Sequence, residues 1–162
     1  DHFSLPTDTL FKASKNKKLH RNFMGYTSQK TDLMIGLGMS AISDSWSAFA
    51  QNVKTVKEYE MLVNKGEIPI FRGHILSDID LEVRQHILNL MCQFETKWIQ
   101  NQEIQINKFL LREIEQDGLI KSDALGIQIY EEGKPFVRNV CMALDQYLLS
   151  KEKEQQLFSM TV

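Results

Sequence analysis

The sequence has very few cysteines: only Cys92 and Cys141 occur among its 162 residues. They lie far apart, inside apolar patterns typical of helices, and form neither a Cys-x-x-Cys pair nor a disulfide framework. Disulfides persist mainly outside the reducing cytoplasm. We therefore expect both cysteines to be reduced and buried, and the protein to be cytoplasmic.

Long hydrophobic runs and an excess of one charge are also missing. No stretch approaches the ~18 apolar residues that a transmembrane helix requires, so no membrane partner is expected. The formal net charge is −2, whereas nucleic-acid-binding domains usually carry a strong basic excess. The 43% hydrophobic content, with nine Phe and two Trp, is sufficient for a core and excludes a disordered chain.

Motifs for independent catalysis or metal binding are absent as well. None of the four histidines forms a His-x-x-x-His pair or joins a cysteine at metal-ligand spacing. No Gly-x-Ser-x-Gly nucleophile motif is found. The stretch "GLGMSA", residues 36–41, has only two of the three glycines of a dinucleotide-binding loop, which favours a plain packing loop. The sequence predicts no catalytic residue and no metal ligand within this chain.

The first half of the chain mixes helix and strand signals. The predicted elements are a helix over 8–17 with Thr7 as N-cap, loop or irregular strand over 19–31, a buried strand with a tight turn over 32–43, a helix over 53–67 ending at Gly66, and a short strand over 68–76. Gly36 and Gly38 weaken a strand interior, which usually means that another backbone or a ligand approaches closely.

The second half predicts a different arrangement. Ser77 is a good N-cap for a helix over 77–94, a second helix covers about 104–117, two strands flank the turn at 123–126, and a last helix runs over 135–156. Helix, helix, β-ribbon and helix form a winged-helix-like pattern. The sequence thus predicts an α+β protein with a boundary between residues 1–72 and 73–162.

Several blocks of the sequence, taken in order, resemble one enzyme family. They are "DHFSLPTDTL", "LHRNFMGYTSQKTDLMIGLGMSAIS", "FAQN", "FRGHILSDID", "VRNVCMALDQYL" and the ending "FSMTV". Together they resemble the C-terminal portion of the oxygen-independent coproporphyrinogen III oxidases (dehydrogenases), which are radical S-adenosylmethionine enzymes of heme biosynthesis. The block Arg-Asn-Phe-x-Gly-Tyr-Thr distinguishes them from the related heme chaperones, whose corresponding stretch reads His-Asn-x-x-Tyr-Trp.

The resemblance implies both a fold and an activity. Residues 1–72 would be the closing end of the radical SAM α/β barrel, and residues 73–162 a mostly helical, winged-helix-like C-terminal domain. The parent enzyme would oxidatively decarboxylate two propionates of coproporphyrinogen III to vinyl groups, giving protoporphyrinogen IX. The partners of this chain would be that substrate and the rest of the catalytic barrel.

The family's Cys-x-x-x-Cys-x-x-Cys motif, which holds a [4Fe-4S] cluster, is absent from this sequence. Three thiolates leave the fourth iron open for S-adenosylmethionine, and two distant cysteines cannot supply them. We therefore expect the chain to be a piece of the enzyme. Alone, it should be inactive and bind neither the cluster nor S-adenosylmethionine.

The resemblance also implies cofactor contacts at three positions. Ile42 matches the apolar contact to S-adenosylmethionine, and Phe23 and Met24 fall where the family places further contacts. Many members carry Gln at the position of Met24, so the polar contact there is altered. The alternative interpretation is that all three side chains simply pack.

A basic stretch, residues 12–21, offers a second hypothesis. Because coproporphyrinogen carries four propionates, Lys15, Lys17, Lys18 and Arg21 could attract it to the barrel mouth. The plainer interpretation is a solvated helix end.

A different class of function also fits the predicted elements. The chain could be a freestanding winged-helix-like binding module for a protein or a nucleic acid. Its last helix, with Arg138 and Asn139 beside Asp145 and Gln146, is not basic enough to support nucleic-acid binding.

Overall fold

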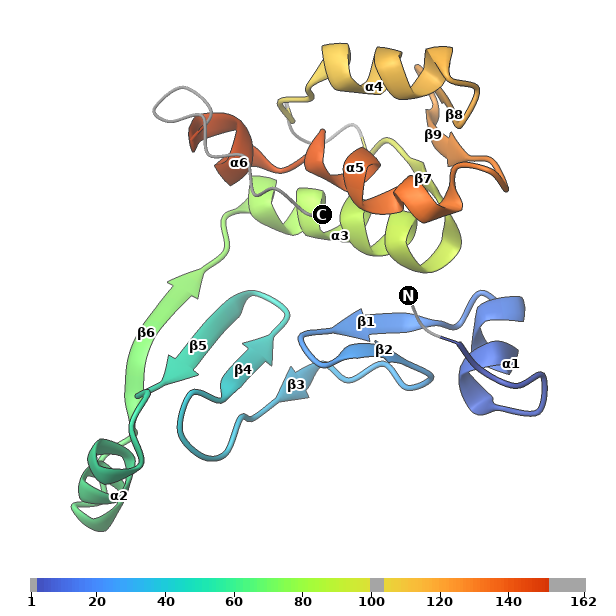
Figure 1. Ribbon diagram of the computed structural model, residues 1–162. Coiled ribbons are helices and arrows are strands. Elements are labelled where there is room, and N and C mark those ends of the chain that lie inside the picture. The colour runs from blue at the N-terminus through green and yellow to red at the C-terminus, as the bar shows by residue number, and fades with distance from the viewer. Residues whose placement is uncertain (1–2, 100–103, 152–162) are drawn as a thin grey trace.

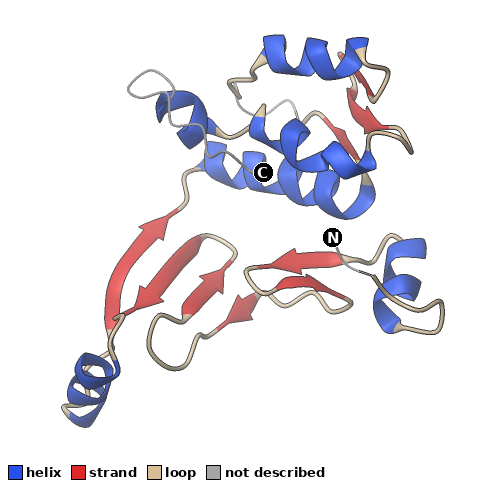
Figure 2. Ribbon diagram, in the orientation of Figure 1, coloured by secondary structure: helices blue, strands red, loops and turns tan. Residues whose placement is uncertain are grey.

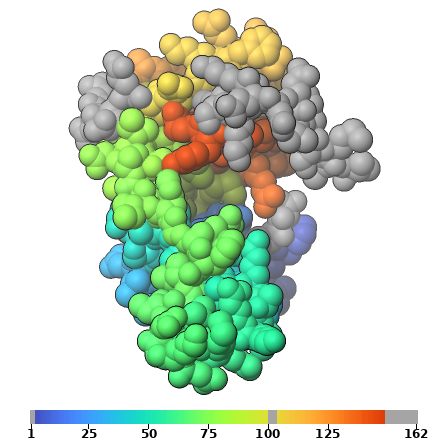
Figure 3. Space-filling view, turned by 90° about the vertical axis from the view of Figure 1, so that its left-hand side faces the viewer, coloured from blue at the N-terminus to red at the C-terminus, as the bar shows by residue number. Residues whose placement is uncertain are grey.

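The computed structural model describes residues 3–99 and 104–151 and shows two layers (Figure 1). The lower layer is rich in strands and the upper one in helices (Figure 2). In side view the region of helix α2, Val56–Asn64, forms the lower end of the molecule (Figure 3). The mixed helix and sheet architecture predicted from the sequence is confirmed.

The lower layer begins with a helix and a hairpin. Helix α1, Thr9–Lys15, is capped by Asp8, whose side chain accepts a hydrogen bond from the Leu10 backbone at 2.7 Å. The prediction of Thr7 as N-cap was therefore wrong by one residue, because Asp8 has the extended backbone that a cap requires. Strands β1, His20–Asn22, and β2, Gly25–Thr27, form an antiparallel hairpin where loop or irregular strand was predicted.

A four-stranded antiparallel sheet follows, in the order β3–β4–β5–β6. Its strands are Leu33–Met34, Ile42–Ser45, Ala48–Asn52 and Ile70–Ile75. The predicted buried strand over 32–43 is wrong: β3 has two residues, and Leu33, Ile35 and Leu37 are exposed. They lie at an edge of the sheet that no other described element covers.

Helix α2 and strand β6 complete this layer. α2 has no buried residue, and the chain leaves it through Gly66, whose φ of +75° suits glycine. All six residues of β6 are exposed. The strand continues through residues 72 and 73, where the sequence predicted a boundary, and its pairing with β5 extends to Ile75.

The upper layer contains the remaining elements. They are α3 (Asp78–Gln93), β7 (Glu95–Lys97), α4 (Lys108–Gln116), β8 (Ile120–Asp123), β9 (Gly126–Ile129), the 3-10 turn η1 (Lys134–Phe136), α5 (Val137–Met142) and α6 (Gln146–Lys151). The predicted cap of α3 is confirmed: Ser77 and Asp80 form a reciprocal capping box. The ribbon predicted around 123–126 is also confirmed, and β7 adds a third strand in the order β7–β9–β8.

The predicted continuous last helix is wrong within the described residues. Helix α5 ends at Met142. Asp145 caps a new helix by accepting hydrogen bonds from the Tyr147 and Leu148 backbones at 3.0 and 2.9 Å. Asp favours such caps because its short carboxylate satisfies otherwise unpaired N–H groups. The rest of the predicted helix, residues 152–156, and the ending 158–162 lie outside the described residues.

The hydrophobic core lies in the upper layer. Leu90 of α3, Ile120 of β8, Val140 of α5 and Leu144 after it are fully buried there. Both cysteines are free and buried in this core, as predicted. No helix among residues 3–99 and 104–151 has the length and apolar character needed to cross a membrane.

Arg84 of α3 joins the two layers. Its guanidinium donates to both carboxylate oxygens of Asp44, at 2.9 and 2.7 Å, and to the Trp46 carbonyl at 2.8 Å. It also lies over the rings of Trp46 and Phe49, 4.7 and 4.8 Å from their centroids. The two charged side chains are only 15% and 11% exposed, so each depends on the other for compensation of its charge.

Replacing either Arg84 or Asp44 with Ala should lower the free energy of unfolding by about 3 kcal/mol, because one shielded charge then lacks its partner. The double variant should cost less than the sum of the two. Urea unfolding followed by tryptophan fluorescence measures this. The exposed pair of Lys121 and Asp123 supplies the control, since Lys121→Ala should be almost silent. Additive losses in the double variant would contradict the coupling.

A second buried polar group, His86, lies inside the upper layer. His86 Nδ1 and Thr96 Oγ1 form a hydrogen bond of 2.8 Å, and the imidazole lies edge-on to the ring of Trp98. The Nε2 atom faces Glu82 Oε1 at 3.8 Å, and neither atom has a hydrogen-bond partner among the described residues. Burial lowers the pKa of His86, although the Glu82 carboxylate opposes this shift.

Because its pKa is lower in the folded than in the unfolded state, His86 should make stability pH-dependent. Above the unfolded pKa of about 6.5 the imidazole is neutral in both states, and as the pH falls below that value the unfolded state binds the proton more readily. The free energy of unfolding should therefore decline from pH 7.5 to 5. In His86→Asn, urea unfolding over this range should show a shallower decline, and an unchanged slope would refute the assignment.

Candidate functional site

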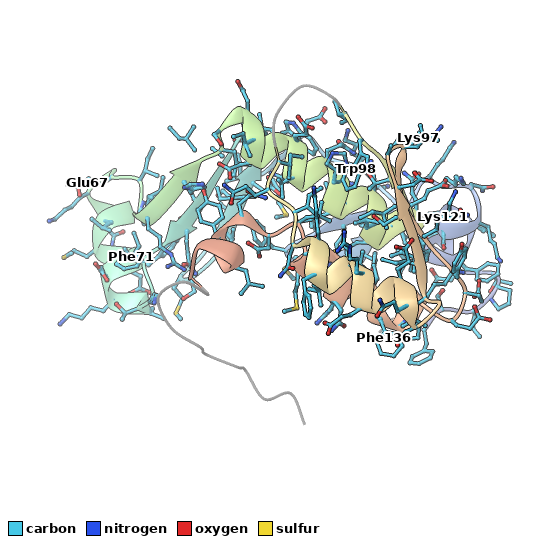
Figure 4. All side chains as sticks on the ribbon, turned by 90° about the horizontal axis from the view of Figure 1, so that it is seen from above. Glu67, Phe71, Lys97, Trp98, Lys121 and Phe136 are labelled. Atoms are coloured by element: carbon cyan, nitrogen blue, oxygen red, sulfur yellow. The ribbon has the colours of Figure 1, made fainter. Side chains whose placement is uncertain are left out.

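A cleft of about 590 Å³ lies between the two layers. Its lining comes from β1, β4, β5 and the β1–β2 turn below, and from α3, α5 and α6 above. Seen from above, Glu67 and Phe71 mark one end of the molecule, and Lys97, Lys121 and Phe136 lie at the other (Figure 4). The cleft has the size and the concave, mostly apolar character of a small-molecule site.

The β1–β2 hairpin supplies the lower wall at one end of the cleft. The Asn22 side chain accepts a hydrogen bond from the Met24 backbone at 2.9 Å, which shapes the turn between the strands. Phe23 lines the cleft, is 50% exposed and packs edge-on to Phe49, with ring centroids 5.0 Å apart. Met24 is 87% exposed and does not line the cleft.

Ile42, the third predicted cofactor contact, begins β4 and is half-buried. It is not among the residues that line the cleft. The fold thus brings Phe23 and Met24 together in one turn, while Ile42 lies on another strand. Its backbone packs tightly on Gly36: a Cβ added at Gly36 would lie 2.7 Å from the Ile42 carbonyl oxygen. The close backbone approach predicted at this glycine is confirmed.

Two residues that the sequence analysis missed hold the Gly-Leu-Gly loop. The Asn52 side chain donates to the carbonyls of Gly36 and Gly38, at 3.0 and 2.8 Å, and the Tyr59 hydroxyl accepts from the Gly38 backbone at 3.0 Å. Asn52 is buried although it is polar. An Asn at the end of a strand that begins with Ala-Phe-Ala is the sequence signal that could have indicated this role.

A polar cluster joins β6 of the lower layer to the upper wall of the cleft. The Tyr147 hydroxyl lies 2.8 Å from His74 Nε2, and Asp80 accepts hydrogen bonds from the Ser77 backbone and hydroxyl at 2.9 and 2.8 Å. Burial alone would raise the pKa of Asp80, but the hydrogen bonds from Ser77 outweigh it and lower the pKa. Asp80 is therefore ionised at neutral pH and committed to the helix cap.

The basic stretch does not converge on this cleft. Lys17 and Lys18 line a separate cleft of about 420 Å³, and Lys17 pairs with Glu95. Lys15 lies over the ring of Phe11. Of the four basic residues predicted to attract substrate, only Arg21 lines the larger cleft.

The two cysteines are unreactive thiols. Burial raises the pKa of Cys92 to about 11 and that of Cys141 to about 12, so at neutral pH both are thiols rather than the thiolates that bind metals. In the described part of the chain, no group of three or more His, Cys, Asp or Glu side chains could hold a metal ion.

Comparison with known proteins reveals one group of relatives. No protein-family model matches the chain. The oxygen-independent coproporphyrinogen III oxidase of Synechocystis sp. is 35% identical over 100% of this chain and 37% of its own length. The enzyme of the same name from Escherichia coli K12 is 36% identical over 96% of this chain and 36% of its own length.

A solved structure agrees with the sequence matches. Coproporphyrinogen III oxidase from Escherichia coli, described as a radical SAM enzyme, superposes with a TM-score of 0.82 at 35% identity, over 91% of this chain and 36% of its own. The chain thus spans little more than a third of the relatives it matches. By sequence and by fold, it is similar to the C-terminal part of the oxygen-independent coproporphyrinogen III oxidases.

Proposed function

We propose that this chain is the C-terminal part of an enzyme that oxidatively decarboxylates two propionates of coproporphyrinogen III to vinyl groups, giving protoporphyrinogen IX. The observation that carries the proposal is the agreement of sequence and fold, at 35% identity and a TM-score of 0.82, with a coproporphyrinogen III oxidase. Two buried free thiols suit a reducing compartment, so we place the enzyme in the cytoplasm.

The lower layer would close the catalytic barrel. Strands β3 and β6 are the two edges of its sheet, and exposed edges readily pair with further chain. Apolar side chains such as Leu37, Phe71 and Ile75 are also left exposed, which is unusual unless another surface covers them. The rest of the catalytic barrel would supply that surface. We place the division between barrel end and C-terminal domain after β6, at the start of α3.

The upper layer would act as a winged-helix-like cover over the barrel mouth. It has its own core, and Arg84 attaches it to the lower layer above the cleft. Excluding water there would protect reactive intermediates from side reactions.

Of the two cofactors of the whole enzyme, the residues of this chain fit S-adenosylmethionine but not the [4Fe-4S] cluster. The [4Fe-4S] cluster does not fit, because the two cysteines are buried in a hydrophobic core and protonated. S-adenosylmethionine fits better at Phe23, whose half-exposed ring offers an apolar face, with Met24 and Ile42 as further contacts. When bound in the whole enzyme, this cofactor would supply the radical chemistry. The residues of this chain would orient it and shield it from water.

A freestanding binding module is the alternative function. It would leave the exposed edges and apolar side chains of the lower layer uncovered, which favours the enzyme. A reading frame that extends upstream through a Cys-x-x-x-Cys-x-x-Cys motif would support the enzyme, whereas a native start just before Asp1 would support the module.

The role of Ile42 can be tested in the intact enzyme. Ile42→Asp should abolish S-adenosylmethionine binding, because it places an unpaired charge against an uncharged part of the cofactor. Ile42→Val should be nearly silent, since it removes one methylene at a cost of about 1 kcal/mol. Cofactor affinity and thermal unfolding are measured in parallel. A folded Asp variant with unchanged affinity would remove Ile42 from the site, and a variant that merely unfolds would make it a packing residue.

The chain alone should form no iron–sulfur cluster. Anaerobic reconstitution of residues 1–162 with iron and sulfide should leave the visible spectrum featureless, because the three accessible thiolates that a cluster requires are not available. A stoichiometric absorbance typical of [4Fe-4S] would contradict this prediction. The intact enzyme, reconstituted in the same way, is the positive control.

A further inference from the structure

Two arginines face the cleft from opposite layers. Arg21 comes from β1 in the lower layer, and Arg138 comes from α5 in the upper layer. Neither forms an ion pair with a carboxylate of residues 3–99 or 104–151. Two cations therefore line this cleft without compensation from the described part of the chain.

Arg21 packs on an aromatic ring. Its guanidinium lies over the ring of Tyr26, 4.9 Å from the centroid. Burial raises the pKa of Cys92 and Cys141, and the positive charge of Arg21 opposes part of this rise. The Tyr26 hydroxyl in turn donates to the Met91 carbonyl of α3 at 3.1 Å, so the ring that Arg21 covers is attached to the upper layer.

Each carboxylate in the cleft lining already has another role. Asp44 is bound by Arg84, Asp80 caps α3 through Ser77, and Asp145 caps α6. None of the three forms an ion pair with Arg21 or Arg138. The carboxylates of the lining are therefore engaged by groups other than Arg21 and Arg138.

The rest of the lining sets the character of the ligand. Phe49, Val83, Ile87 and Met91 also line the cleft and give it an apolar body. An apolar body with cations on both walls suits a ligand whose hydrophobic centre carries carboxylates at its periphery. Guanidinium groups are especially suited to carboxylates, because their planar N–H groups can donate two parallel hydrogen bonds.

We propose that Arg21 and Arg138 are positioning residues that bind propionate carboxylates of coproporphyrinogen III from opposite walls of the cleft. The inference rests on the proposed function and extends it to the substrate-binding residues. Phe23 lines the same cleft, so a substrate held by Arg21 would lie beside a proposed cofactor contact. Holding a substrate from two sides restricts its orientation, which is how positioning lowers a reaction barrier.

The test uses the intact enzyme that contains this chain, assayed anaerobically with coproporphyrinogen III. Arg21→Gln and Arg138→Gln should each raise KM about ten-fold or more, as expected for losing a hydrogen bond between charged groups, with kcat changed by less than about two-fold. Arg→Lys at either position should recover part of the loss. Arg112→Gln is the matched control, because Arg112 is an exposed arginine on α4 outside this cleft.

A binding measurement separates recognition from folding. Coproporphyrin III, which is stable and keeps all four carboxylates, should bind the unmodified enzyme more tightly than its tetramethyl ester does, and the double Gln variant should lose most of this preference. If Gln variants do not fold, the folded Lys variants must still show a weakened preference. An unchanged preference, or wild-type KM values in the folded variants, would overturn the proposal.

The proposed function and the arginine assignment can fail separately. If the unmodified enzyme does not convert coproporphyrinogen III, the proposed function is wrong, and the arginine assignment with it. If it does convert this substrate while both Gln variants and their double variant keep the wild-type KM, the proposed function stands and the arginine assignment is wrong.

Discussion

The contact of Arg84 with the β4–β5 hairpin holds the two layers of this protein together. One side chain donates to a carboxylate and a carbonyl and lies over two aromatic rings of the lower layer. Only a guanidinium combines a planar fork of donors with a face that stacks on rings. The Tyr26 hydroxyl donates to the Met91 carbonyl at 3.1 Å and adds a second bridge. The cleft lies between these two layers, so its shape depends on the contacts of Arg84 and Tyr26 that join them.

The two layers differ in how they are stabilised. The upper layer buries a contiguous core between α3, α4, α5 and its three-stranded sheet. Few residues of the lower layer are buried, among them Val53 and Ala13. Because apolar burial is the dominant favourable term in folding, the lower layer depends on contacts outside its own sheet. The relatives that the chain matches are almost three times as long. The additional chain of such a protein would supply the contacts that the lower layer lacks.

The Gly-Leu-Gly loop has a packing role in this fold. Gly36 is required because the Ile42 backbone lies against it, and Asn52 fixes the carbonyls of the loop. These contacts determine where β4 begins and hence where Ile42 lies. A loop that serves only for packing would have the same geometry. Its relevance to the cofactor therefore depends on the chain that would pack beside it.

Local signals in the sequence determined much of the secondary structure. Ser77 and Asp80 start α3, Gly118 follows the end of α4, and the alternation around 123–126 specifies a hairpin, because caps, turns and periodicity act over a few residues. The blocks that resemble the coproporphyrinogen III oxidases likewise indicated the family. The same signals failed at 32–43, where apolar residues predicted burial that this chain does not supply, and after Met142, where Asp145 starts a new helix.

Only the tertiary structure decided which distant residues meet. Arg21 and Arg138 are separated by most of the chain, and nothing in either local sequence pairs them. Periodicity likewise gives no indication that Arg84 pairs with Asp44, which lies forty residues away. Register and layer packing set such contacts, and these depend on the whole fold rather than on neighbouring residues. The sequence by itself therefore indicated many of the elements and the resemblance to this enzyme family, whereas the packing of the layers decided the cleft and its charges.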